Sequence, residues 1–360
     1  MIEICSGAAS EWLCQYRGKK PAFACVLSFT ETGLIEHISA AGQTADDRRY
    51  TAVMDGEFLL AEDATLQAAS HSSLPKLAAG VSPAVITRAV VRSLSIPHYI
   101  LSTGLPTPLQ FPHIALPSVR ARAVHTGCAM SLSQAKGLFQ AGLHWGKRLA
   151  PAGRSYLVIG ECVVGGTTTA QAVLSGLGYA VAGRMSSSHP GGNHAQKQTL
   201  VQQGLSSVRS QRTSTPFSLA AAVGDPMQLV VAGMALSASQ RGGVLLAGGA
   251  QMLAVYGLAR AISSHANITW QPEQVVIGTT RWVIEDESAD TVAIARQLKA
   301  PYLASQISFG QSPYVQLRAY EQGFVKEGVG AGGCAIAAHL YKGWGQSQLR
   351  HAVEAQLRYV

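Results

Sequence analysis

The sequence is poor in charged residues. Of its 360 residues, only 13% are Asp, Glu, Lys or Arg, which is about half of the usual fraction. We therefore expect part of the surface to be buried in an oligomer or a deep cleft. The net charge is +8, but the basic residues are scattered and no Lys/Arg-rich run with interleaved aromatics is present. This excludes nucleic acid as an expected partner and favours small anionic ligands.

Several other signatures are also missing. The six cysteines form no CxxC pair and no secretory start is recognisable, so we expect reduced thiols and a cytoplasmic location. No apolar run reaches membrane-spanning length, since Asp225-Pro226 interrupts the best candidate at 219–238. No membrane partner is expected. A GxSxG elbow is absent, so hydrolases of that class are unsupported.

Apolar strands alternate with helices along most of the chain. We expect strands at 22–27, 96–102, 155–159, 243–247 and 274–278, and helices at 84–94, 132–149, 170–177, 251–262 and 289–298. This order predicts an α/β fold with a mostly parallel sheet and helices on both faces, a Rossmann-like three-layer arrangement. We expect one unit over 1–360. Its large α/β domain spans approximately 80–330, and a smaller helical subdomain combines the N-terminal segment with a C-terminal helix at 335–360.

Two polar stretches have a simple structural interpretation. The charged residues at 45–51 are expected to form a solvated loop. His189 and His194 could bind a metal, but no Cys or carboxylate stands at ligand spacing beside them. A loop rich in turn residues is favoured there, and no metal site is predicted.

The first informative motif covers 160–169 and reads GECVVGGTTT. It follows an apolar strand and precedes a helix, so backbone N–H groups and a helix N-terminus point at one place, where a phosphate fits. Gly160, Gly165 and Thr167 match the P-loop spacing, but Gly166 replaces its lysine. That lysine contacts the outer phosphates of a triphosphate, so we predict a monophosphate ligand. The alternative is a tight turn whose threonines only cap the helix.

Gly248-Gly249 follow the expected strand at 243–247. Ligands of parallel α/β sheets bind beyond the carboxyl ends of the strands. The first motif and this glycine pair are therefore expected to line one crevice.

The second motif lies at 325–333 and reads VKEGVGAGG. Its glycines let a ligand approach the backbone closely, and Glu327 would then be partly desolvated with its pKa raised toward that of a base. The alternative is an exposed glutamate before a flexible turn. Gly328, Gly330 and Gly333 also spell GxGxxG, but the preceding strand is poor, so a dinucleotide site is disfavoured.

Together the two motifs resemble the nicotinate-nucleotide–dimethylbenzimidazole phosphoribosyltransferases of cobamide biosynthesis, in particular their divergent archaeal and cyanobacterial branch. The bacterial first loop reads roughly GE-x-x-x-GNTT, and here Gly166 replaces the asparagine. Residues 326–331 match the family's GEGTGA, and Gly224-Asp225-Pro226 match its GDP. Ala247 stands in place of an aspartate in the V-L-x-D-G segment. The resemblance runs from about residue 50 to residue 339, and the N-terminal part departs from the bacterial branch, so base-binding residues are not transferred.

The resemblance implies phosphoribosyl transfer from nicotinate mononucleotide to a lower-ligand base, a benzimidazole or a purine. The products would be an α-riboside 5′-phosphate and nicotinate, for assembly of the cobamide nucleotide loop. Glu327 would be the catalytic base and Glu161 a second catalytic carboxylate. The phosphate- and nucleotide-binding residues would be Gly165, Gly166, Thr167, Thr168, Lys197, Gly248, Gly249, Gly328 and Gly330. No metal or other cofactor is implied, and the family is homodimeric.

Two other functions fit the same residues. A nucleosidase would use water in place of the acceptor base. A non-catalytic protein would bind a mononucleotide or a cobamide precursor without transforming it.

Overall fold

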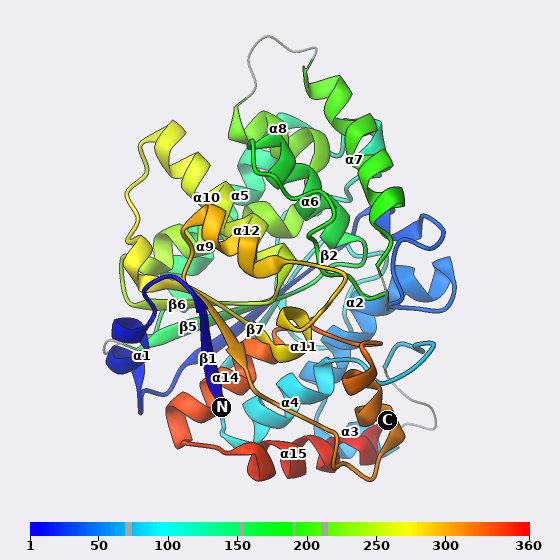
Figure 1. Ribbon diagram of the computed structural model, residues 1–360, viewed down its shortest axis with the longest axis vertical. Helices are drawn as coiled ribbons and strands as arrows, with labels where there is room; N and C mark the ends of the chain where they lie inside the picture. The colour runs from blue at the N-terminus through cyan, green and yellow to red at the C-terminus, as the bar shows by residue number, and fades with distance from the viewer. Residues whose placement is uncertain (69–73, 152–154, 190–191, 210–214) are drawn as a thin grey trace.

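An eight-stranded sheet runs through the middle of the molecule (Figure 1). The computed structural model describes residues 1–68, 74–151, 155–189, 192–209 and 215–360. The strand order is β1-β8-β7-β6-β5-β2-β3-β4, and all neighbours are parallel except β1 and β8. The predicted mostly parallel sheet is confirmed. The strands are β1 (Ile2–Ser6), β2 (Ala22–Ser28), β3 (His98–Thr103), β4 (Ile114–Ala115), β5 (Tyr156–Cys162), β6 (Gly243–Ala247), β7 (Val275–Thr280) and β8 (Tyr302–Ser305).

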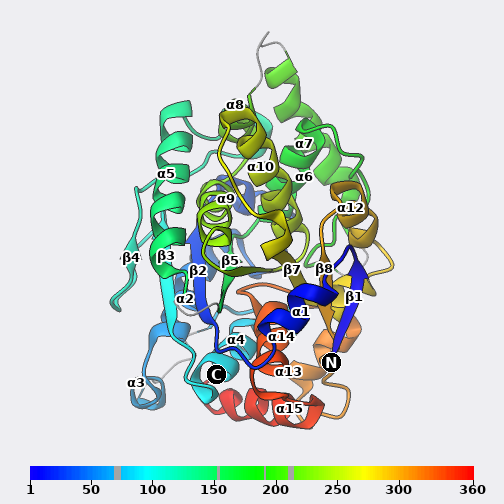
Figure 2. The same ribbon diagram turned by 90° about the vertical axis from the view of Figure 1, so that its left-hand side faces the viewer.

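Helices cover both faces of this sheet, as Figures 1 and 2 show. One face is covered by α5 (Leu132–Leu149), α6 (Gly166–Gly176), α8 (Pro216–Val223), α9 (Pro226–Ser239), α10 (Ala250–Ala266) and α12 (Thr291–Leu298). The other is covered by α1 (Ser10–Tyr16), α2 (Ala45–Leu60), α4 (Ala84–Ser93), α14 (Ala331–Lys342) and α15 (Gln346–Glu354). The remaining α-helices are α3 (Asp63–Ala68), α7 (His194–Arg209), α11 (Arg281–Ile284) and α13 (Val315–Arg318). None of the helices within the described ranges has both the length and the apolarity that a membrane span requires.

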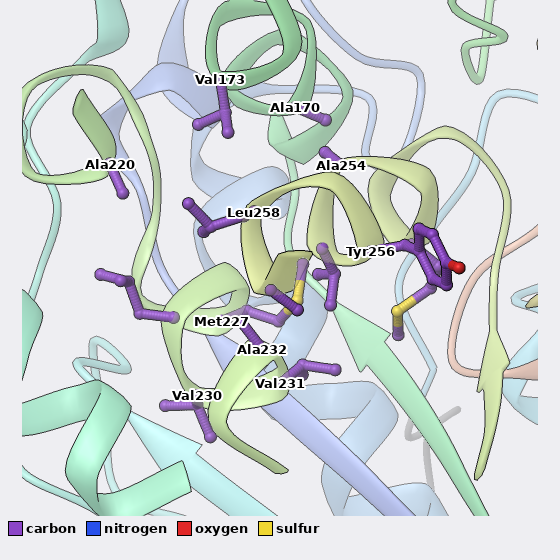
Figure 3. Packing of buried hydrophobic residues seen from close by; sticks show 14 of the residues in the cluster. Ala170, Val173, Ala220, Met227, Val230, Val231, Ala232, Ala254, Tyr256 and Leu258 are labelled. Carbon is purple, nitrogen blue, oxygen red and sulfur yellow. The ribbon is translucent and has the colours of Figure 1, made fainter. Parts of the chain in front are cut away.

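The larger core is built from small and branched side chains. Figure 3 shows Ala170, Ala220, Ala232 and Ala254 of four helices among valines, leucine and methionine. Glycines bring α5 and α9 together, because a Cβ on Gly142 would lie 2.1 Å from a backbone oxygen of α9. Small residues allow such backbone contact, and close packing then stabilises both helices.

The chain changes direction across the sheet between β2 and β5. Strand β3 lies on one side of β2, whereas β5 to β8 follow one another on the other side. In open α/β sheets this switch point, at the carboxyl ends of the strands, is where ligands bind. The turns after the two strands touch there: Gly165 has φ +84°, and a Cβ on it would lie 2.6 Å from Gly33 N.

Residues 45–51 form the first turns of α2, so the expectation of a solvated loop was wrong. Thr44 begins the helix with a capping box: its Oγ1 accepts from Asp47 N–H at 3.1 Å, and Asp47 Oδ2 accepts from Thr44 N–H at 2.9 Å. The acidic residues Asp46 and Asp47 in this first turn favour the helix through its dipole. Beyond this turn α2 becomes buried, and it carries Asp55 into the interior.

The N-terminal segment contributes to two parts of the molecule. Its strands β1 and β2 belong to the sheet, whereas α2 packs against α4 on one face. At the other end of the chain, α14 packs on β6, β7 and β8, and α15 packs on α4. The division into a large domain at 80–330 and a smaller helical subdomain stays a prediction.

Candidate active site

A cavity lies at the carboxyl ends of the central strands. It is lined from segments that are far apart in the sequence, including Glu161 near the end of β5, the first turn of α6, Gly249 after β6 and the turn that carries Glu327. This is the edge of the sheet at which the chain changes direction.

The two sequence motifs are in direct backbone contact. Val329 N–H donates to the carbonyl oxygen of Glu161 at 2.8 Å, and a Cβ on Gly160 would lie 3.0 Å from Gly330 Cα. Val329 also accepts a 2.8 Å hydrogen bond from Thr87 Oγ1 through its own carbonyl. The backbone of Val329 has φ +54°, which is unfavourable for a β-branched residue. These contacts fix the second motif against the first.

Four donors hold the carboxylate of Glu327. Its Oε1 accepts from Gly332 N–H at 3.0 Å and from Gly328 N–H at 3.2 Å. Its Oε2 accepts from Thr279 Oγ1 and Thr280 N–H, both at 2.9 Å. Burial raises the pKa of Glu327 to about 7, and the four hydrogen bonds oppose this rise because they favour the ionised form. The carboxylate is thus oriented and titrates near neutral pH, although part of its surface faces the cavity.

Glu161 is more deeply buried, with only 3% of its surface exposed. Burial raises the pKa of Glu161 to about 8, and the negative charges of Asp225 and Glu327 raise it further. Hydrogen bonds from the Val163 backbone and the Gln251 side chain act in the opposite direction. The two carboxyl groups therefore differ at pH 7: Glu161 keeps its proton more readily, and Glu327 ionises first.

The first turn of α6 forms part of the cavity wall. The N-cap is Gly165, which makes no side-chain cap, and Gly166 and Thr167 line the cavity. Gly166 N–H donates to Val163 O at 3.1 Å and Thr168 N–H to Gly165 O at 3.0 Å. Thr169 Oγ1 donates to Asp225 Oδ2 at 2.6 Å. The positive end of the helix dipole therefore favours an anion here, with most N–H groups of the turn already used.

Two lysines lie beside this turn. Lys197 is fully buried, and its Nζ has no hydrogen-bond partner within the described ranges. Burial lowers the pKa of Lys197 to about 7, the charge of Lys326 adds to the effect, and Asp286 opposes it. Lys326 lines the cavity and pairs with Asp286 at 2.7 Å. Lys197 Nζ therefore feels the charge of Asp286 but forms no hydrogen bond within the described ranges.

The structure brings most, but not all, of the predicted site residues to the cavity wall. Those that line it are Glu161, Gly165, Gly166, Thr167, Gly249, Glu327 and Gly328. The other four, Thr168, Lys197, Gly248 and Gly330, lie behind the wall. Gly330 begins α14 at φ +79°, and a Cβ on Gly248 would lie 2.9 Å from Met252 Cγ. The positive φ explains the glycine at 330, and the close packing against Met252 explains the glycine at 248.

Sequence reasoning missed several cavity residues. Ser186, Ser187 and Ser188 line it, and Ser186 Oγ donates to Asp286 Oδ2 at 2.7 Å. The three consecutive serines could have marked this part of the cavity in the sequence. Asp55 and Ser82 line the cavity from the N-terminal segment, and no motif marks them.

Of the two histidines considered as metal ligands, His194 begins α7 and His189 precedes that helix. His194 Nε2 is 2.5 Å from the carbonyl oxygen of Ser288, a backbone partner. Within the part of the chain that the structure describes, no cluster of three or more His, Cys, Asp or Glu is arranged to hold a metal ion.

Comparison with known proteins agrees with this geometry. Residues 100–274 match a family model described as phosphoribosyltransferase. The UPF0284 protein of Cyanothece sp. (strain PCC 7425 / ATCC 29141) is 56% identical over 348 residues, covering 96% of this chain and 94% of the relative. The UPF0284 protein of Acaryochloris marina (strain MBIC 11017) is 52% identical, covering 97% and 94%.

A solved structure shares the fold. The nicotinate-nucleotide-dimethylbenzimidazole phosphoribosyltransferase from Thermus thermophilus superposes with a TM-score of 0.59 at 19% identity, covering 94% of this chain and 83% of that one. The resemblance inferred from the two motifs is confirmed. The chain belongs to the UPF0284 family, and the match over its central segment makes it a phosphoribosyltransferase.

Proposed function

We propose that this protein transfers a phosphoribosyl group from nicotinate mononucleotide to a lower-ligand base, a benzimidazole or a purine. The observation that carries the proposal is the shared cavity of Glu327 and the first turn of α6. The 2.8 Å hydrogen bond from Val329 to Glu161 joins the two motifs at that cavity. A mononucleotide needs both an anion site and a group facing its anomeric carbon.

The single phosphate of nicotinate mononucleotide suits the end of the cavity at α6. Gly166 and Thr167 offer the helix N-terminus, and Lys326 and the hydroxyl groups of Ser186–Ser188 lie on the same wall. The buried ammonium of Lys197 would gain the hydrogen-bond partner that it lacks within the described ranges. Charge-assisted hydrogen bonds of this kind are stronger than neutral ones.

The reaction breaks one C–N bond and forms another at C1′ of the ribose. The electron pair of the breaking bond returns to the nicotinate ring nitrogen and neutralises the pyridinium, so the leaving group needs no acid. A ring nitrogen of the incoming base forms the new bond to C1′, and the proton on its other ring nitrogen passes to Glu327. One ionised carboxylate suffices, whereas glycoside hydrolysis commonly uses two carboxyl groups.

The geometry supports different roles for the two glutamates. Glu327 ionises first, and the acceptor N–H could replace its longest hydrogen bond, the one from Gly328 at 3.2 Å. Glu161 stays protonated more readily and lies close enough to couple to Glu327. We infer that Glu161, as a protonated carboxyl group, orients the reacting groups through hydrogen bonds.

Mass spectrometry of the products tests the proposal. The protein is incubated with nicotinate mononucleotide and 5,6-dimethylbenzimidazole, adenine or no base. The expected product is the riboside 5′-phosphate of the added base, with nicotinate released only when a base is present. Nicotinate release that ignores the base would indicate the nucleosidase. Binding of the mononucleotide without any product would indicate the non-catalytic alternative.

We also propose that the protein acts as a homodimer in the cytoplasm. The low fraction of charged residues, 13%, supports a buried subunit surface. The thiols of all six cysteines are free, which fits a reducing compartment. Light scattering of the purified protein and fractionation of cells would test the two statements separately.

A further inference from the structure

Asp55 is a buried carboxylate that the reaction described above does not use. It lies on α2, has 2% of its surface exposed and lines the cavity. Two groups donate to it: Ser82 Oγ to Oδ1 at 2.5 Å, and Cys162 Sγ to Oδ2 at 3.4 Å. No Lys, Arg or His within the described ranges forms an ion pair with it.

These two donors leave acceptor capacity on Asp55 unused. An ionised carboxylate can accept about four hydrogen bonds, and a thiol is a weak donor. Ser82 is fixed in its donor role, because its Oγ also accepts from Ala84 N–H at 3.2 Å. Burial raises the pKa of Asp55 to about 6, so the group is still largely ionised at neutral pH. A buried acceptor without sufficient donors favours a ligand that brings them.

Asp55 lines the same cavity as Glu161 and Glu327. Its partner Cys162 directly follows Glu161 in β5. Its other partner, Ser82, precedes Pro83, whose Cγ would lie 3.6 Å from a Cβ on Gly328, the residue after Glu327. Asp55 is thus joined through Cys162 and Ser82 to the segments that carry the two glutamates.

The wall around Asp55 suits a flat heterocycle. Pro83, Val163, Val164, Leu77 and Phe324 line the cavity together with it. An aromatic ring fits against such apolar side chains. Between these walls, Asp55 and Ser82 offer polar atoms toward an edge of the ring that is not the reacting one.

We propose that Asp55, positioned by Ser82, is a specificity-determining residue that selects an acceptor base with an exocyclic amino group. This inference rests on the proposed transfer reaction. An amino group donates to the free lone pairs of Asp55. The methyl groups of 5,6-dimethylbenzimidazole cannot donate, and they would leave those remaining lone pairs of the buried carboxylate unused. Sites built to hydrogen-bond a substrate reject analogues that lack the polar group strongly.

The test compares adenine, unsubstituted purine and 5,6-dimethylbenzimidazole as acceptors, with nicotinate mononucleotide as donor. For the parent, we expect kcat/KM for adenine to exceed that for purine by at least about tenfold. In Asp55→Asn the amide oxygen is needed by Ser82, so its NH₂ group faces the amino group of adenine. The adenine-to-purine ratio should fall toward one. Because both bases are measured on the same protein, partial loss of folding cancels in the ratio.

Two variants serve as controls. Asp46→Asn removes the same charge from the exposed start of α2 and should leave the ratio unchanged. Ser82→Ala frees Asp55 to rotate and should lower the ratio less than Asp55→Asn does. A parent ratio near one, or a ratio that Asp55→Asn does not change, would overturn the inference.

Calorimetric binding of the bases in the presence of nicotinate separates this inference from the proposed reaction. If no base yields a riboside phosphate but adenine binds at least about tenfold more tightly than purine and Asp55→Asn removes the difference, the selectivity stands and the reaction fails. If every base is transferred at similar rates, the reaction stands and the selectivity fails.

Discussion

The basic and the acidic groups in and around the cavity differ in the charge that they lack. Behind the cavity wall, Lys197 Nζ has no hydrogen-bond partner within the described ranges, and burial lowers the pKa of Lys197 to about 7. On the wall itself, burial raises the pKa of Glu161 to about 8, that of Glu327 to about 7 and that of Asp55 to about 6. The same desolvation therefore acts with opposite sign on the two sets of groups.

This difference indicates the shape of the ligand. An anion beside the lysine and N–H donors beside the carboxyl groups would return each of these groups toward its ordinary pKa. A phosphoribosyl donor and a heterocyclic acceptor bound together would supply both. The binding energy would come from interactions with groups that are buried in the folded protein.

The largest expected effect comes from the carboxyl groups. We expect Glu327→Gln to lower kcat roughly 10²–10⁴-fold, because the amide cannot accept the acceptor proton. Affinity for nicotinate mononucleotide should remain largely unchanged, since the proposed phosphate site is intact. Turnover by mass spectrometry and binding by calorimetry measure the two effects separately. Glu273→Gln, at an exposed position, is the control; a turnover of Glu327→Gln within a few-fold of the parent would refute its role as base.

A substitution at the proposed phosphate site should instead affect mononucleotide binding. Replacing Lys197 with Met should weaken mononucleotide binding about 10- to 100-fold, the usual range for one hydrogen bond to a charged group. The free protein should become more stable at pH 7. The unfolded chain binds the lysine proton more tightly than the folded one, so the parent loses stability as pH falls from about 10.5 toward about 7.

Calorimetric titration and thermal melting of Lys197→Met provide both readouts. Lys136→Met, on the exposed side of α5, should change neither. Unaltered mononucleotide affinity in Lys197→Met would place the phosphate elsewhere in the cavity.

The dependence of turnover on pH should report the ionisation of Glu327. Because Glu327 must be ionised to accept a proton and burial raises its pKa to about 7, kcat at saturating mononucleotide, where bound phosphate keeps Lys197 charged, should fall between pH 8 and pH 6. In Glu327→Gln this acid limb should disappear. The folded protein also binds protons at Glu161 and Glu327 more tightly than the unfolded chain, so their contribution to stability is present at pH 4 and is lost as pH rises toward 8. A profile that is flat between pH 6 and pH 8 would contradict the assignment.

The smallest effect is expected at Gly165, and it is primarily structural. Its φ of +84° and the 2.6 Å approach of a Cβ to Gly33 N both disfavour a side chain. We expect Gly165→Ala to lower the free energy of unfolding by about 1–3 kcal/mol. Gly183→Ala is the matched control, since φ is +71° there and nothing lies within 4 Å of its Cβ. Equal thermal shifts in the two variants would show that the contact with Gly33 is unimportant.

The sequence predicted helices and strands well where neighbouring residues favour the same secondary structure. Helix α5 covers the expected residues 132–149, because Ser131 and Gln134 form a capping box and an apolar face recurs at helical spacing. Strand β6 matches 243–247 for a similar reason, since a continuous apolar run fits a strand buried on both faces. Helix α2 was missed because its charged first turn resembles a loop and its buried face contains Asp55 rather than only apolar residues.

The candidate site was predictable only where a motif is contiguous. The turns at 160–169 and 325–333 are recognisable in the sequence by their glycines and a carboxylate. They are in contact in the structure. Asp55, Ser82 and Asp286 become neighbours of these turns only through the order of the strands. A single aspartate in a helix has no local signature, so its place at the cavity depends on the tertiary fold.

Contacts within the protein itself fix the turn between Glu327 and α14. Val329 adopts a backbone conformation that costs energy, and it is held there by hydrogen bonds to Glu161 and Thr87. This cost is part of the folding free energy, so ligand binding does not have to order the segment and loses less entropy. The carboxylate that we propose as the base is thereby preorganised at the expense of overall stability.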